Sequence, residues 1–159
     1  RIIPDMIKAA NSNDSLKIRS PRATRPWQHV LEPLSGYLCV GQELLEGNSN
    51  AADGWNFGPE NENNQFVIDI VEKSKLYWNK VSYELDKESN LHEAQNLMLD
   101  SSKAKKELKW FPVWNYESTI EETIIWYKEY YENGVILTHK QLIKFINDAN
   151  NKNIKWAKS

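Results

Sequence analysis

The arginines are the residues of this chain whose type and spacing say most about chemistry. All four, Arg1, Arg19, Arg22 and Arg25, fall within the first 25 positions, and every later side chain with a permanent positive charge is a lysine. The planar guanidinium binds phosphate oxygens through paired hydrogen bonds, a role that lysine does not fill. The cluster therefore indicates a site for a small molecule that carries phosphate. The alternative is a solvated loop with surface ion pairs.

The histidines and the cysteine indicate no metal site. His29, His92 and His139 are far apart in the chain and none lies in a metal-binding spacing. The single cysteine, Cys39, excludes an intramolecular disulfide and fits a cytoplasmic location. We expect its thiol to be buried and unreactive. The polar pair His92 and Glu93 could face a ligand or belong to a hydrogen-bonded loop.

Two motif searches limit the chemistry further. The six glycines form no GxGxxG, so the chain lacks the glycine-rich cradle that holds a dinucleotide. Tyr83 and Lys87 have the spacing of the catalytic pair of short-chain dehydrogenases. That mechanism needs both side chains on one helix face, whereas this stretch has the pattern of a strand end followed by a turn. We therefore interpret the match as a coincidence.

Composition predicts one packed domain. The chain has 159 residues, a net charge of −2, 40% hydrophobic residues, seven tryptophans and seven tyrosines. Its charge gives no reason to expect nucleic acid as a partner, and no apolar stretch approaches the roughly 20 residues that cross a bilayer. The chain begins with Arg1 rather than Met and shows no charged-then-apolar leader, which suggests a fragment of a longer protein.

Hydrophobic periodicity and turn residues predict five or six helices and only short strands. Helices are expected at residues 3–10, 33–45, 66–78, 102–108, 118–133 and from 138 onward, and strands at 16–18, 27–30, 54–59, 81–85 and 96–99. Residues 19–26 should form a basic loop because of two prolines.

Details of packing and capping follow from single residues. Gly36 and Gly41 suggest that their helix packs closely against a neighbour. Two capping boxes are predicted, one from Ser118 and Glu121 and one from Thr138 and Gln141. Gly134 is predicted to end a helix. The last helix should bury Leu142, Phe145 or Ile146, and Ala149.

These elements predict a fold of the α/β class, or α+β for the isolated piece, without a complete Rossmann sheet. We expect residues 1–150 to form the domain and residues 151–159 to fray.

Several segments together resemble one enzyme family. They are RIIPD (1–5), IRSPRAT (18–24), RPWQHVLEPLSGYL (25–38), GWNFGP (54–59), HEA (92–94), LDSSKA (99–104) and LKWFPVW (108–114). In these the chain is similar to the C-terminal part of the CDP-glucose 4,6-dehydratase family, within the extended short-chain dehydrogenase/reductases. The resemblance extends to about Asn147.

The resemblance implies a two-part NAD-dependent lyase. An N-terminal Rossmann half, absent from this chain, would hold NAD and the catalytic tyrosine and lysine. The C-terminal half would close over the nucleotide sugar. The family oxidises C4 of CDP-glucose, eliminates water and returns the hydride to C6, giving CDP-4-dehydro-6-deoxyglucose for deoxysugar and surface polysaccharide synthesis. The parent enzyme would be a homo-oligomer in the cytoplasm, and this chain alone would be inactive, with no catalytic, cofactor-binding or metal-binding residues.

The same resemblance implies which residues bind substrate. Arg25 would grip the diphosphate, and Arg1 would lie near the phosphates. Ile18 and Arg19 would frame the base and ribose, and Asn56 would face the nucleotide. His92 and Glu93 would lie in a loop that closes over it. Two alternatives remain open: the corresponding part of another nucleotide-sugar epimerase or dehydratase, and a non-catalytic nucleotide-sugar-binding module.

Overall fold

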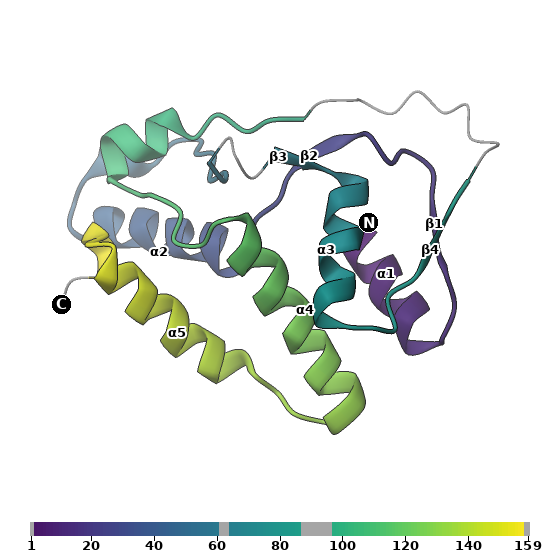
Figure 1. Ribbon diagram of the computed structural model, residues 1–159. Helices are drawn as coiled ribbons and strands as arrows, with labels where there is room; N and C mark the ends of the chain where they lie inside the picture. The colour runs from purple at the N-terminus through teal and green to yellow at the C-terminus, as the bar shows by residue number, and fades with distance from the viewer. Residues whose placement is uncertain (1, 61–63, 87–96, 158–159) are drawn as a thin grey trace.

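The computed structural model describes residues 2–60, 64–86 and 97–157, and within them the fold is mostly helical, as predicted (Figure 1). The elements in chain order are α1 (Ile2–Asn11), β1 (Leu16–Ile18), β2 (Thr24–Pro26), α2 (Leu31–Leu45), η1 (Ser49–Ala51), β3 (Asn64–Phe66), α3 (Val67–Tyr77), β4 (Tyr83–Leu85), η3 (Ala104–Leu108), α4 (Tyr116–Asn133), α5 (Thr138–Asn151) and η4 (Lys155–Ala157).

The strands form two separate pairs. β1 and β4 are parallel, with Leu16 opposite Tyr83, and β2 and β3 are antiparallel, with Arg25 opposite Gln65. Within the described residues no larger sheet forms. The expectation of short strands without a complete Rossmann sheet is therefore confirmed.

The main core lies where α1, α3 and α4 pack around β1. These helices lie side by side in Figure 1. They bury apolar side chains at helical spacing, which is what positions each helix against its neighbours. The core contains Met6, Ile7, Ala10, Leu16, Ile18, Ala23, Val67, Ile70, Val71, Trp78, Val81, Ile120 and Ile124.

Two smaller clusters hold the other half of the molecule together. One joins α2 to η3 and contains Cys39, Phe57, Ala104, Leu108 and Trp110. Cys39 is buried, as predicted, and burial raises the pKa of its thiol to about 11. The other cluster lies under α5 and contains Val113, Trp114, Phe145, Ala149 and Ile154.

Two predicted strands are wrong. Residues 27–30 and 54–59 form no ladder, and the strand in the first region is β2, three residues earlier. Pairing with β3 places β2 at Thr24, and the chain turns at His29, whose carbonyl accepts from the Glu32 amide at 3.0 Å. Residues 97–99 also lack strand structure, and residue 96 lies outside the described part.

The predicted helix caps also need correction, although Gly134 ends α4 with φ +66° as expected. The Asn115 side chain caps α4 by accepting from the Ser118 amide at 3.0 Å, so Ser118 lies inside the helix. At α5 the Thr138 hydroxyl instead accepts from Trp126 Nε1 at 2.9 Å. α5 buries Gln141 with Phe145 and Ala149, and leaves Leu142 and Ile146 exposed.

Within residues 151–159, which were expected to fray, Ile154 and Trp156 pack against α5, and residues 158–159 lie outside the described part. Ile154 is only 6% exposed, and the Trp156 ring stacks on Phe145 with centroids 5.7 Å apart. Lys152 Nζ donates to the Val113 carbonyl. Removal of this apolar surface from water explains the packing of the tail.

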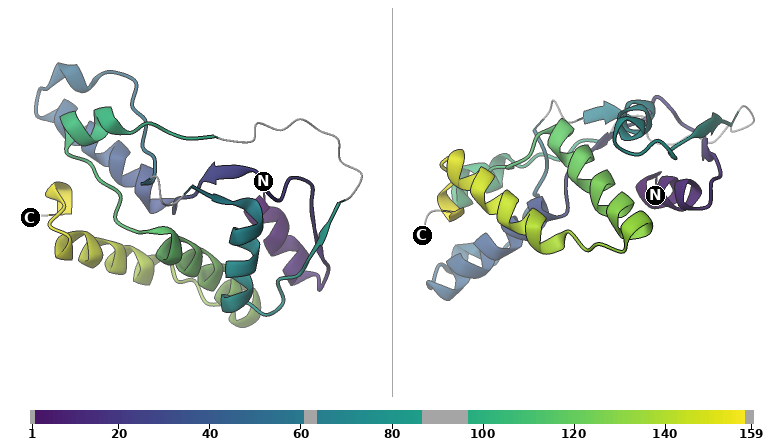
Figure 2. Two further views of the ribbon diagram at one scale, coloured as in Figure 1. Left: turned by 45° about the horizontal axis from the view of Figure 1, so that its top comes forward. Right: turned by 60° about the horizontal axis from the view of Figure 1, so that its bottom comes forward.

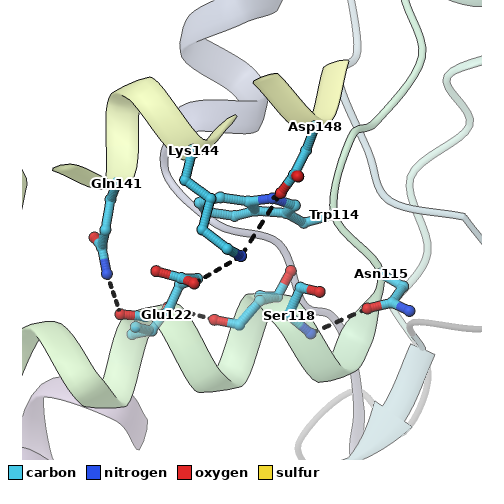
Figure 3. A network of polar contacts seen from close by, with 9 residues as sticks. Trp114, Asn115, Ser118, Glu122, Gln141, Lys144 and Asp148 are labelled. Atoms are coloured by element: carbon cyan, nitrogen blue, oxygen red, sulfur yellow. Dashed lines mark hydrogen bonds and ion pairs between the residues drawn. The ribbon is translucent and has the colours of Figure 1, made fainter. Parts of the chain in front are cut away.

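Polar contacts connect α5 to α4 and to the segment before it (Figure 3). Lys144 Nζ lies 2.8 Å from Glu122 Oε1, and Gln141 Nε2 donates to the Glu122 carbonyl at 2.7 Å. Asp148 Oδ2 accepts from Trp114 Nε1 at 2.8 Å. These contacts complement a modest apolar interface.

Among the described residues, Glu32 in α2 carries the most deeply buried carboxyl group. Its side chain is 0% exposed and accepts from the Trp114 amide at 2.7 Å and from the Val113 amide at 3.0 and 3.1 Å. Burial raises its pKa to about 7, opposed by these amide bonds and by Lys152. Burial lowers the pKa of nearby His29 to about 4, opposed by Glu122.

We expect these two groups to affect stability in opposite directions. Between pH 4.5 and 6.5 folded Glu32 keeps a proton that the unfolded chain releases, so its contribution falls as pH rises. Folded His29 lacks a proton that the unfolded chain holds, so its contribution rises. In Glu32→Gln only the His29 contribution remains. The free energy of unfolding of this variant should therefore increase by up to about 3 kcal/mol from pH 4 to 6.5. Urea titration at several pH values measures it.

A variant at the other buried group tests the direction of this pH dependence. His29→Gln should show the reverse slope, because only the Glu32 contribution then remains. Parallel profiles for Glu32→Gln and wild type would contradict this account.

The two helical glycines of α2 make a second test. A Cβ added at Gly36 would lie 2.3–2.5 Å from the Phe57 ring, whereas one added at Gly41 would meet nothing within 4 Å. Close packing is thus confirmed at Gly36 and wrong at Gly41. We expect Gly36→Ala to lower the free energy of unfolding by about 1–3 kcal/mol. Gly41→Ala should raise it by about 0.5–1 kcal/mol through helix propensity. Equal effects in urea unfolding would rule out the proposed contact.

Candidate functional site

A pocket of about 620 Å³ lies where the start of α1 meets β1, β2 and the start of α3. It is lined by Ile2, Ile3, Pro4, Asp5, Leu16, Lys17, Ile18, Arg19, Ser20, Arg25, Trp27 and Val67. β1 is held by β4 and β2 by β3, so each of the two strands that line the pocket is fixed by a partner strand. The first turn of α1 contributes a further wall.

The charged lining favours an anion. Lys17, Arg19 and Arg25 line the pocket together with the carboxylate of Asp5. The residues at the start of α1, Ile2 to Asp5, line the same pocket. This combination suits the oxygens of a phosphate or diphosphate.

Arg25 is held at the pocket by its own strand. Its backbone pairs with Gln65 across the β2–β3 ladder, and its Nη1 donates to the Thr24 carbonyl at 2.7 Å. Arg25 as a whole is half-buried, so it is partly withdrawn from solvent. Such a cation interacts more strongly with an anion than a fully exposed one does.

Trp27 separates this pocket from a second cavity. Its indole Nε1 donates to the Gln65 carbonyl at 3.1 Å, which fixes the ring. Trp27 and Ile3 line both spaces. The second cavity, of about 450 Å³, is formed mainly by apolar and aromatic side chains of the 27–31 segment and α4, and no lysine or arginine lines it. The pocket with the arginines is therefore the candidate anion site.

The structure brings together three of the predicted site residues. Ile18, Arg19 and Arg25 all line the 620 Å³ pocket, although Ile18 is only 1% exposed. Asn56 is exposed and does not line this pocket, so the structure does not group it with the arginines. Arg1, His92 and Glu93 lie outside the described residues.

Sequence reasoning missed two charged members of the lining, Asp5 and Lys17. Lys17 lies between buried Leu16 and Ile18, and the alternation of β1 could have indicated that it faces away from the core. Arg22 belongs to the sequence cluster but is exposed and does not line the pocket. Proximity in sequence therefore identified the region of the site rather than its members.

The described residues give little support for a catalytic tyrosine, a metal site or a membrane span. Tyr83 lies in strand β4, where a hydrogen bond to Glu72 raises the pKa of its phenol, the opposite of what a catalytic tyrosine needs. Lys87 lies outside the described part. Residues 2–60, 64–86 and 97–157 contain no cluster of three metal-ligating side chains. Nor does the described part contain a helix of the length and apolarity that spanning a bilayer requires.

Comparison with known proteins gives one curated relative. No protein-family model matches the chain. The CDP-glucose 4,6-dehydratase of Salmonella typhimurium is 43% identical over 129 residues, which are 80% of this chain and 36% of that protein.

Solved structures with a similar fold act on other nucleotide sugars. The UDP-glucuronic acid 4-epimerase of Bacillus cereus, in complex with UDP-glucuronic acid and NAD, matches 79% of this chain and 38% of its own, with a TM-score of 0.63 and 20% identity. The dTDP-glucose 4,6-dehydratase of Bacillus anthracis, in complex with NAD, matches 81% of this chain and 39% of its own, with a TM-score of 0.61 and 20% identity. At this identity the likeness concerns the fold alone.

The chain thus spans little more than a third of the proteins it matches. The resemblance indicated by its motifs is confirmed: most of this chain is similar in sequence to a CDP-glucose 4,6-dehydratase and in fold to part of the extended short-chain dehydrogenase/reductases that include nucleotide-sugar epimerases and dehydratases.

Proposed function

We propose that this chain is the C-terminal, substrate-binding part of a CDP-glucose 4,6-dehydratase and that the 620 Å³ pocket holds the diphosphate of the nucleotide sugar. The observation that carries the proposal is the meeting of Arg19 and Arg25 in one pocket at the start of α1. The 43% identity to a CDP-glucose 4,6-dehydratase selects CDP-glucose as the first ligand to test.

The lining suits both ends of such a ligand. The guanidinium groups can form charge-assisted hydrogen bonds with diphosphate oxygens. The indole of Trp27 and the apolar side chains of Ile3 and Val67 offer a wall for a base or sugar ring. Asp5 opposes an anion on one side of the pocket and can accept hydrogen bonds from hydroxyl groups.

NAD does not fit the residues of this chain. A dinucleotide needs a glycine-rich turn between a strand and a helix, and none of the six glycines provides that spacing. The parent enzyme would bind NAD in a separate N-terminal Rossmann half, which would also supply the catalytic tyrosine and lysine. That enzyme, a cytoplasmic homo-oligomer, would convert CDP-glucose to CDP-4-dehydro-6-deoxyglucose.

A second candidate is the same part of another nucleotide-sugar enzyme, such as an epimerase. The structural likeness to an epimerase, with a TM-score of 0.63, is as close as that to a dehydratase at 0.61, so the fold of this part does not separate the two. Sequence identity favours the dehydratase. A third candidate is a non-catalytic module that binds a nucleotide sugar.

Substitution of Arg25 tests the diphosphate site. Loss of a paired, charge-assisted contact costs about 1.5–3 kcal/mol, so Arg25→Ala should weaken CDP and CDP-glucose binding by about 10- to 150-fold. Arg25→Lys should recover only part of the affinity because it lacks the planar fork. Calorimetry with both ligands and with UDP-glucose measures these effects and the base preference.

Arg22→Ala is the matched control, because Arg22 belongs to the same cluster but does not line the pocket. It should bind CDP-glucose like the wild type. Equal losses for Arg22→Ala and Arg25→Ala would point to a general charge effect and would remove the pocket from consideration.

Catalysis gives an independent prediction. With CDP-glucose and NAD supplied, this chain alone should form no dehydrated product, because the residues that accept a hydride or remove a proton are expected on the missing half. Mass analysis of the nucleotide sugar after prolonged incubation detects loss of water. Turnover by the purified chain would show that it carries catalytic residues of its own.

A further inference from the structure

The cavity of about 450 Å³ beside Trp27 has no role in the proposed function. Residues 27–31 form one wall, a face of α4 forms another, and the start of α5 and Ile3 of α1 complete it. The start of α5 lies beside α4 in both views of Figure 2, and there Trp126 Nε1 donates to Thr138 Oγ1 at 2.9 Å. The volume is within the range of about 300–1,000 Å³ that is usual for small-molecule sites.

The wall of this cavity is largely apolar and carries no acidic side chain, lysine or arginine among the described residues. Three aromatic rings, those of Trp27, Trp126 and Tyr127, line it together with aliphatic side chains. His29 also lines it, and burial lowers the pKa of its ring to about 4, so the ring is uncharged at neutral pH. Such a wall favours an uncharged ring, because an ion buried there would have no partner.

Two polar side chains of the wall have hydrogen-bonding capacity that nothing uses. Gln28 Nε2 donates to the Phe57 carbonyl at 3.0 Å, whereas Gln28 Oε1 and Thr119 Oγ1 are buried and have no partner in the described part of the chain. Thr119 as a whole is only 3% exposed. Buried polar atoms in native proteins are normally paired, so these two atoms indicate a missing partner.

A hydroxyl group suits both of these atoms. The Gln28 carbonyl oxygen only accepts hydrogen bonds, and the Thr119 hydroxyl can donate or accept. A hydroxyl group can donate to the first and accept from the second, which neither a carboxylate nor an ammonium group can do. A single water molecule, which takes up about 30 Å³, would leave most of the cavity empty.

We propose that the 450 Å³ cavity binds an uncharged cyclic or aromatic alcohol, whose ring packs on the aromatic wall and whose hydroxyl group pairs with Gln28 and Thr119. This site is separate from the candidate anion site, although Trp27 and Ile3 line both. The inference goes beyond the proposed function and does not depend on it.

Two probes of the same shape test the ring and the hydroxyl group separately. p-Cresol is an aromatic ring with one hydroxyl and one methyl group, and p-xylene has methyl in place of the hydroxyl. Each is titrated into this chain while the indole N–H resonances of the tryptophans are followed by NMR. Both probes should give saturable shifts at Trp126, which lines the cavity, and none at Trp55, which does not. The dissociation constant for p-cresol should be about 1 mM or lower.

Thr119→Val tests the hydroxyl pairing, because it removes the hydroxyl of the wall and nearly keeps the shape of the side chain. It should weaken p-cresol binding by about 3- to 10-fold, the usual effect of one hydrogen bond. Binding of p-xylene should stay the same or become tighter. Equal weakening of both probes, or no change for p-cresol, would overturn the assignment of an alcohol.

Thr123→Phe tests the location by filling the cavity. Thr123 lies on the α4 wall, and a ring at this position should weaken binding of both probes by at least about tenfold. Ile125→Phe is the matched control, since it adds a ring to the same helix at a partly exposed position outside the wall, and it should bind like the wild type. The proposal is wrong if wild-type Trp126 shows no saturable shift, as expected where water alone pairs the buried atoms. Full binding by Thr123→Phe, or equal loss in Ile125→Phe, would also contradict it.

Discussion

The buried carboxyl group of Glu32 connects the parts of this molecule that have no common apolar core. It joins α2 to the backbone of Val113 and Trp114, in the segment between η3 and α4. One turn further along α2, Ser35 Oγ accepts from Trp110 Nε1 at 2.8 Å. Removal of such an acceptor leaves buried amides without partners, at a cost of about 1–3 kcal/mol each. The orientation of α2 therefore depends on polar contacts as much as on packing.

The Glu32 contacts also affect the candidate site, because α2 follows closely after β2 in the chain. β2 runs into α2 after only four residues, so the segment with Trp27 and His29 is held at both ends. Its first end is held by pairing with β3, and its second by the Glu32 contacts and the edge-to-face packing of His29 on Trp114, with centroids 4.7 Å apart. Arg25 and the Trp27 ring take their places in the pocket wall from this short, doubly anchored segment.

Local sequence patterns predicted what depends on local physics. The helical stripes of α1 and α3 and the end of α4 at Gly134 follow from spacing and backbone preference within one segment. Strands at 27–30 and 54–59 were wrong because a strand exists only where a partner pairs with it, and a local pattern does not reveal that partner. Ser118 and Asn115 are both good caps, and tertiary packing decides which one begins the helix.

The candidate site shows the same difference between what a local sequence pattern predicts and what depends on packing. Clustering of arginines identified Arg19, which follows β1, and Arg25, which lies in β2. It could not exclude Arg22 or include Lys17 and Asp5, whose places depend on how β1 and α1 pack. The fold of this part does not separate an epimerase from a dehydratase, since both match it at 20% identity with TM-scores of 0.63 and 0.61.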